Sequence, residues 1–139
     1  MTTPEKLKWI VDKYGGIPAD FRDLDSLTTW QRKLACVLFE YSTEVGDLHK
    51  SAKGAEYMRK SAYEKKRLEL IAAGKSAAAA DAEAKASIDT LAFTEVVSDA
   101  DYRAAMLQLQ AARDVLEAMR QHISSLKEER RIEMAGLTS

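Results

Sequence analysis

The chain has 139 residues, of which 31% are charged and only 7% aromatic. This length suits one domain with a modest core, and the composition is typical of helices and coiled coils. A single cysteine, Cys36, excludes a disulfide framework within the chain. No apolar run approaches the roughly 20 residues that a membrane helix needs. We therefore expect a soluble, cytoplasmic, all-α protein without a membrane partner. Because much of its apolar content is alanine, which buries little area, we also expect an elongated molecule or a homo-oligomer that completes the hydrophobic core.

The net charge of −1 hides an uneven distribution along the chain. Residues 49–75 carry eight Lys or Arg against three Asp or Glu, whereas residues 76–100 carry one against five. No basic field covers the whole molecule, but a basic block is followed directly by an acidic block.

The first 27 residues predict a short helix and a loop. A Thr-Pro start and a Gly-Gly stop bound an amphipathic helix over residues 4–14. Residues 17–25 are expected to form a loop that Phe21 and Leu24 hold against the core. The whole of residues 1–27 is expected to pack at the base of the remaining chain.

Residues 28–139 predict two long helices that pack on each other. The first begins with a capping box formed by Thr28 and Gln31, and it runs to about Ala73. Its apolar positions alternate in steps of four and three, which is the heptad spacing of a packed helix seam. They are Leu34, Leu38, Tyr41, Val45, Leu48, Ala52 and Ala55.

A turn at residues 74–76 separates the two helices, because Gly74 suits a left-handed C′ position and Ser76 suits an N-cap. A connection this short makes the helices antiparallel, so the predicted fold is a coiled-coil-like helical hairpin in a single domain. A second capping box at Ser98 leaves a break near residues 94–99 open. The second seam is predicted at Ile88, Leu91, Glu95, Asp99, Tyr102, Met106, Leu109, Leu116, Met119, Ile123, Leu126 and Met134.

No pattern in the sequence predicts catalysis, a cofactor or a metal. His49 and His122 have no ligand partners at metal-binding spacing. Gly74-Lys75-Ser76 imitates the end of a phosphate-binding loop, but Leu68 stands where that loop needs its first glycine. The carboxylates are spread as surface charge rather than gathered in a pocket. We therefore expect a protein that is not an enzyme.

The basic block is the candidate functional site. Lys53, Lys60 and Arg67 share one helical stripe at seven-residue spacing, and Tyr57 and Tyr63 lie close by. Cations with interleaved aromatic rings suit single-stranded nucleic acid, whose phosphates meet the cations while its bases stack. The competing interpretation is charge pairing inside the hairpin, with residues 65–67 opposite residues 81–83. The candidate nucleic-acid-binding residues are Lys53, Arg59, Lys60, Lys65, Lys66, Arg67 and Lys75.

Over residues 30–137 the layout resembles the UvsY-type recombination mediators of T-even-like phages, and more loosely the small helical proteins of phage recombination modules. The matching pieces are an early Trp-bearing segment, a basic helix ending in YEKKRLELIAAGKS, an alanine- and acid-rich restart, and a final helix ending in RRIEMAGL. The resemblance is one of pattern and rests on no catalytic motif.

The resemblance implies a homo-oligomeric mediator that binds single-stranded DNA, contacts a recombinase and a single-strand-binding protein, and works in a phage-infected or bacterial cell. It places the DNA contact just before the turn, at Lys65, Lys66 and Arg67. This chain departs from the family in being less basic. The alternative is a coiled-coil interaction or assembly protein, such as an adaptor, chaperone or inhibitor, that does not bind DNA.

Overall fold

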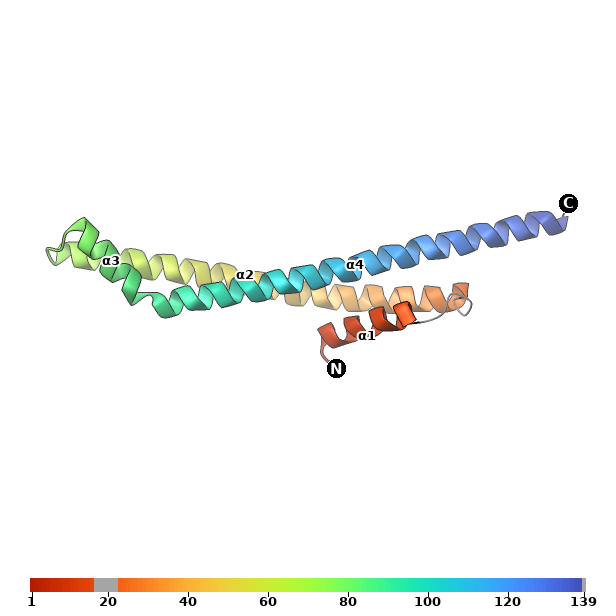
Figure 1. Ribbon diagram of the computed structural model, residues 1–139, viewed down its shortest axis with the longest axis horizontal. Coiled ribbons are helices and arrows are strands. Elements are labelled where there is room, and N and C mark those ends of the chain that lie inside the picture. Colours follow the sequence, from red (N-terminus) through yellow and green to blue (C-terminus); the bar gives the residue numbers. More distant parts are fainter. Residues whose placement is uncertain (17–22, 139) are drawn as a thin grey trace. The chain divides into compact units, whose positions relative to one another are not determined.

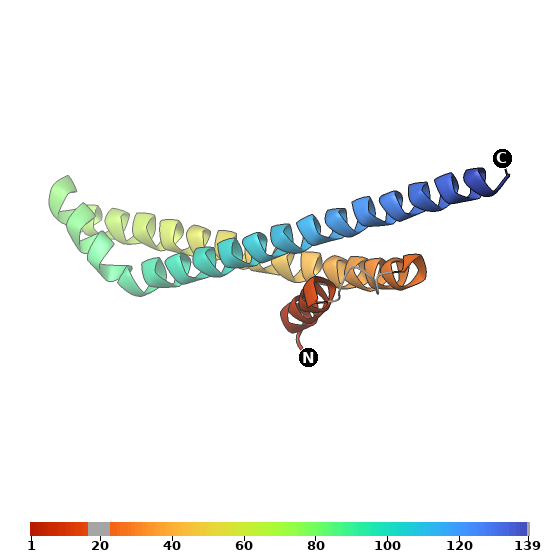
Figure 2. The same ribbon diagram turned by 45° about the vertical axis from the view of Figure 1, so that its right-hand side comes forward.

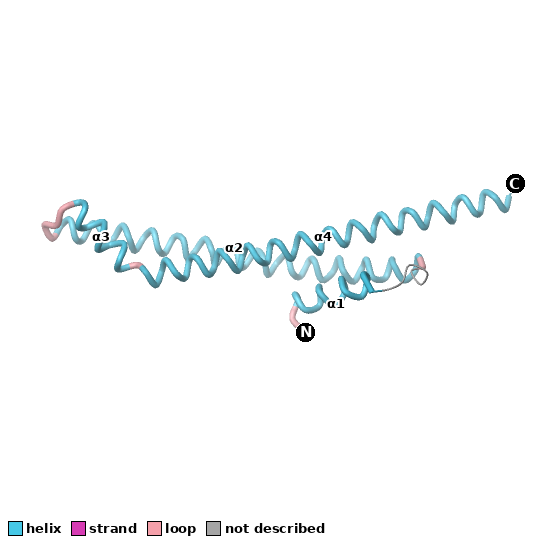
Figure 3. Tube along the Cα trace, viewed as in Figure 1, coloured by secondary structure: helices cyan, strands magenta, loops and turns pink. Residues whose placement is uncertain are grey.

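The computed structural model describes residues 1–16 and 23–138, and this part of the chain is helical with no β-strand (Figures 1 and 3). The two long helices α2 and α4 pack against each other, and the short α1 contacts α2. The predicted all-α helical hairpin is therefore confirmed. The helices are α1 (Thr3–Gly16), α2 (Leu24–Ala72), α3 (Ala77–Ser87) and α4 (Asp89–Thr138).

The chain forms two compact units, each with a core of its own. Unit 1 comprises Met1–Glu44 and Leu107–Ser139, and unit 2 comprises Val45–Met106. Unit 1 thus contains α1, the first part of α2 and the later part of α4, and both ribbon views place α1 alongside α2 (Figures 1 and 2). Unit 2 contains the rest of α2, all of α3 and the start of α4.

Helix α1 begins with a capping box at Thr2, one residue before the predicted Thr3 cap. The Glu5 N–H donates to the Thr2 hydroxyl at 3.3 Å, and the Thr2 N–H donates to the Glu5 carboxylate at 3.2 Å. The helix continues to Gly16, slightly beyond the predicted range, and buries Leu7 and Ile10. The predicted contact of Phe21 lies outside the described residues.

Helix α2 begins earlier than the predicted start at Thr28, which is a correction. The cap is Asp23, whose carboxylate accepts from the Ser26 N–H at 2.7 Å. The extra turn is favoured because it brings Leu27 into the core, where it is almost fully buried. Thr28 lies inside the helix, and its hydroxyl donates to the Leu24 carbonyl at 2.8 Å.

The predicted turn after α2 is confirmed in position and in chemistry. Gly74 has φ of +94°, which side chains with a Cβ rarely adopt. The Gly74 N–H donates to the Ile71 carbonyl at 3.0 Å and the Lys75 N–H to the Leu70 carbonyl at 3.1 Å, which together form a Schellman motif. The Ser76 hydroxyl then accepts from the Ala79 N–H at 3.2 Å and caps α3.

The second arm is interrupted at Ile88 and not at residues 94–99, so the alternative break is wrong. The Ile88 N–H donates to the Lys85 carbonyl, and the Ser87 hydroxyl donates to the Ala84 carbonyl at 2.8 Å. These bonds close the last turn of α3 while Ile88 stays buried. The predicted cap at Ser98 lies within the continuous α4.

The heptad seam of α2 is confirmed from Leu34 to Ala52, with Leu48 only half buried. The seam of α4 needs two corrections. Met106 is exposed, and the neighbouring Ala105 is buried in its place. Met134 is also exposed, and residues 127–137 of α4 have no buried side chain.

A candidate nucleic-acid interface on the basic half of α2

The exposed side of α2 in unit 2 carries a row of cations around one aromatic ring. We define the outer stripe as Lys50, Lys53, Tyr57, Lys60 and Lys65, all of which are exposed. Tyr57 lies four residues after Lys53 and three before Lys60, so these three side chains are neighbours on the helix surface. Residues 50–67 carry seven Lys or Arg against two Glu, so positive charge prevails locally.

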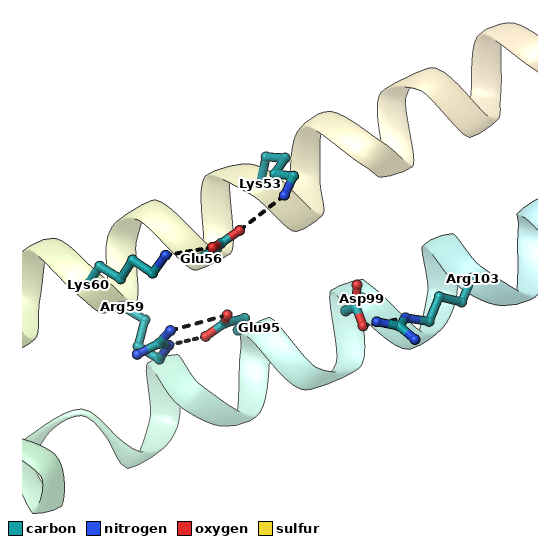
Figure 4. Close-up of polar contacts among 7 residues, drawn as sticks. All are labelled: Lys53, Glu56, Arg59, Lys60, Glu95, Asp99 and Arg103. Carbon is teal, nitrogen blue, oxygen red and sulfur yellow. Dashed lines mark hydrogen bonds and ion pairs between the residues drawn. The ribbon is translucent and has the colours of Figure 1, made fainter.

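Two cations of the outer stripe share a single carboxylate (Figure 4). Glu56 contacts the Lys60 ammonium at 2.7 Å and the Lys53 ammonium at 3.4 Å. These contacts, that of Lys60 first, lower the pKa of the Glu56 carboxyl. The Lys53 and Lys60 side chains remain 67% and 63% exposed. Exposed pairs of this kind contribute little stability, so an incoming phosphate can replace Glu56 as the partner of these cations.

Arg59 points away from the outer stripe and toward the other arm of the hairpin. Its guanidinium is bonded through Nε and Nη2 to Glu95 of α4, the second contact measuring 3.4 Å (Figure 4). The hydrogen bonds to Glu95 raise the pKa of the Arg59 guanidinium above its usual value. Arg59 therefore forms an ion pair between α2 and α4, as the charge-pairing interpretation expects.

At the end of α2 the acidic arm contacts Tyr63 and Lys75 rather than the predicted Lys65, Lys66 and Arg67. The Tyr63 hydroxyl donates to Asp81, whose other oxygen contacts the Lys85 ammonium at 2.9 Å. Arg67 pairs with Glu64 of its own helix at 3.0 Å, and its Nε is buried without a hydrogen-bond partner. Lys75, in the turn, pairs with Glu83.

Lys65 and Lys66 make no ion pair or hydrogen bond within the described part of the chain. Lys65 is exposed and Lys66 is half buried, and both line a groove beside Leu91. The seven predicted residues therefore do not share one face. Lys53, Lys60 and Lys65 lie on the exposed side, Arg59 and Lys66 face the seam, Arg67 lies between them, and Lys75 is in the turn.

A groove of about 450 Å³ opens between α2 and α4 in unit 2, and Lys53 and Glu56 line it together with Glu95. The His49 ring lies against the Tyr102 ring at a centroid distance of 4.7 Å, a pair that sequence reasoning missed. The polar residues Glu95 and Asp99 at predicted seam positions were the sequence signal that could have indicated this groove. Asp99 is bonded to Arg103 at 2.7 Å (Figure 4), so both seam carboxylates already have cationic partners.

Among residues 1–16 and 23–138 no group of histidine, cysteine and carboxylate side chains has the arrangement of a metal site. Within the same residues, no helix has the length and apolarity needed to cross a membrane. The fold and the outer stripe together define a helical-hairpin protein with a local cationic surface. No protein-family model, curated protein or solved structure matches this sequence.

Proposed function

We propose that this protein is a non-catalytic accessory factor that binds single-stranded DNA along the outer stripe of α2. The observation that carries the proposal is the row of exposed ammonium groups around the exposed Tyr57 ring, held only by weak pairs to one carboxylate. Single strands are bound by such combinations, because the cations meet phosphates while a base stacks on the ring.

Unit 2 carries ten Lys or Arg and ten Asp or Glu, so it presents no general attraction for a polyanion. Binding must therefore be short-ranged, and it must weaken steeply with salt. A single chain would bind weakly. A homo-oligomer, as the resemblance to UvsY-type mediators implies, would present several stripes to one strand and raise the overall affinity.

The resemblance also supplies the proposed setting. A mediator of this kind contacts a recombinase and a single-strand-binding protein in the cytoplasm of a phage-infected or bacterial cell. A mediator acts by binding and positioning its partners, so the proposed function requires neither enzyme activity nor a cofactor.

Fluorescence anisotropy with a labelled oligonucleotide at low and moderate salt tests DNA binding. The variant K53Q/K60Q should bind more weakly, and the slope of log K against log salt should become shallower by about 0.7 for each phosphate that the variant no longer binds. K85Q/R103Q is the matched control, since it removes the same net charge from two exposed, carboxylate-paired cations of unit 2 outside the outer stripe. Absence of binding by the unaltered protein at low salt contradicts the proposal.

The aromatic part of the stripe is tested with Tyr57→Ala. Loss of one stacked base should cost about 1–3 kcal/mol of binding free energy. Because the cations still bind their phosphates, the salt slope should not change. An equal loss of affinity for Tyr57→Ala and for Phe39→Ala, which alters an exposed ring of unit 1, would contradict stacking on Tyr57.

The second candidate is an interaction or assembly protein that does not bind DNA. It is favoured by Phe93, Val96 and Val97, which are exposed apolar residues on α4 of unit 2. Phe93 and Val97 continue at heptad spacing to the exposed Ala100 and Ala104, which is the pattern of a seam without a partner. Light scattering that shows an oligomer dissociated by Phe93→Ser, together with no oligonucleotide binding, would favour this candidate.

A further inference from the structure

A second surface, in unit 1, has a different chemistry from the outer stripe. A groove of about 460 Å³ lies between α1 and α2, and its apolar wall includes Trp9, Ile10 and Val37. Trp9 is 44% exposed although it lies beside the buried Ile10 of α1. A large aromatic side chain left open beside aliphatic neighbours is typical of a protein-binding hot spot.

The rim of this groove is cationic. Lys6, Arg32 and Lys33 line it, and none of its described lining residues is a carboxylate. Arg32 has no ion pair or hydrogen bond within the described residues. The Lys6 ammonium lies 3.9 Å from the Glu40 carboxylate, which is close to the outer limit of a salt bridge. The groove therefore combines an apolar interior with positive charge at its edge, of which the Arg32 guanidinium is unpaired within the described residues.

The two tryptophan rings already contact each other and lysine ammonium groups, which argues against a nucleic-acid base as the occupant. Trp9 and Trp30 lie against each other at 5.5 Å between ring centroids. The Lys33 ammonium lies 4.7 Å from the Trp30 ring, and the Lys13 ammonium lies 5.7 Å from the Trp9 ring. A stacking base needs a free ring face, whereas an aliphatic or aromatic side chain needs only the apolar volume between the helices.

We propose that this groove docks an acidic segment of a partner protein. A bulky apolar side chain of the segment enters between Trp9 and Val37, and flanking carboxylates meet Arg32 and Lys33. Charge complementarity selects the segment, because the apolar wall alone would accept any hydrophobic side chain. The inference does not depend on DNA binding by the outer stripe, which lies in the other unit.

Selection of random peptides displayed on a surface, with the full-length protein as bait, tests the inference directly. The enriched peptides should be net acidic and should carry a bulky apolar residue. Trp9 lines this groove and Trp30 contacts Trp9, so a synthetic copy of an enriched peptide should change the tryptophan emission as it binds. Enrichment of neutral or basic peptides, or no enrichment, would overturn the proposal.

Three variants locate the binding site. R32E/K33E should reduce the affinity for the enriched peptide at least tenfold, and Cys36→Phe should block the groove, since Cys36 is exposed and lines it. R113E/R120E makes the same change of net charge on exposed positions of α4 in unit 1 and should bind normally. Circular dichroism confirms that each variant is folded. Equal affinity of all three variants, or displacement of the peptide by an oligonucleotide with salt-dependent tryptophan quenching, would refute the proposal.

Discussion

Leu34 and Phe39 are both large apolar residues of α2 in unit 1, yet they meet opposite environments. Leu34 is fully buried, whereas Phe39 is 77% exposed. The difference follows from the helical period, since Leu34 falls on the seam with Leu38 and Tyr41 while Phe39 does not. Hydrophobicity of the single residue therefore predicts little, and its place in the period predicts burial.

Leu34→Ala should lower the free energy of unfolding by about 2–5 kcal/mol, because it leaves a cavity in the core of unit 1. Urea denaturation followed by circular dichroism measures the change. Phe39→Ala, which removes a larger but exposed side chain, is the control and should stay within about 0.5 kcal/mol of the unaltered protein. Similar losses for the two variants would contradict the assigned seam.

Tyr63 and Asp81 form the polar contact between α2 and α3. The Tyr63 hydrogen bond, followed by that of Lys85, lowers the pKa of the Asp81 carboxyl below its usual 3.8. A lowered pKa means that this contact stabilises the folded state above pH 3.8, and that the stabilisation is lost as pH falls through the folded pKa.

Tyr63→Phe removes the larger cause, so the Asp81 pKa should rise toward 3.8 while Lys85 still holds it somewhat below. An NMR titration of the side-chain carboxyl measures this pKa. Glu128 serves as the internal reference. It lies in unit 1, where Arg131 lowers its pKa, and this pKa should not change in the Tyr63→Phe variant. An unchanged Asp81 pKa would show that the tyrosine does not bond to it in solution.

The helices begin and end where their capping groups lie. Asp23 caps α2 and Ser76 caps α3, and each places an acceptor on the first free N–H groups. The capping box at Thr2 works although the sequence pattern favoured Thr3, which instead donates its hydroxyl to Glu44 at 2.6 Å. Two adjacent residues of the same type compete for a cap, and the packing of α1 on α2 selects between them.

Replacing either of two glycines with alanine should change the stability of the protein in opposite directions. Gly74→Ala should destabilise the protein by about 1–2 kcal/mol, because alanine is strained at φ of +94°. Gly54→Ala should stabilise it by about 1 kcal/mol, since Gly54 lies inside α2 and a Cβ there meets nothing within 4 Å. Thermal unfolding of both variants in one buffer measures the difference, and a shift of the same sign for both would refute the assigned turn.

The two units have cores of different composition. Unit 1 buries mostly large residues, among them Leu7, Leu27, Leu34 and Met119. Unit 2 buries mainly alanines, among them Ala52, Ala80, Ala84 and Ala105, with Val45 and Ile88 as the larger members. Burial of apolar area is the main source of stability, so the core of unit 2 contributes less for each buried residue.

Hydrogen exchange should therefore be faster in unit 2 than in unit 1. Amides of α2 near Leu34 and Leu38 should be more protected than amides of α3 near Ala80 and Ala84, because local opening exposes less apolar surface in α3. Mass spectrometry of exchanged peptides resolves these segments. Equal protection in both segments would mean that the two units open together, contrary to this expectation.

The helical class, the antiparallel arrangement and the bend follow from local patterns in the sequence. Helical periodicity, a glycine that accepts a positive φ and a serine cap are local properties, and the short connection at residues 73–76 turns the second arm, α3 and α4, back along α2. The seam of α2 followed for the same reason, since its heptad spacing is written in one segment.

The packing of the helices on one another sets which neighbouring residues are buried and which charges are paired. Ala105 replaces Met106 in the core, and the second arm breaks at Ile88 rather than near Ser98, because the register of one helix against the other selects the side chains that fit. Arg59 bonds to Glu95 while Lys53 and Lys60 stay on the exposed side for the same reason. Such contacts join residues far apart in the chain, so no pattern within one segment can fix them.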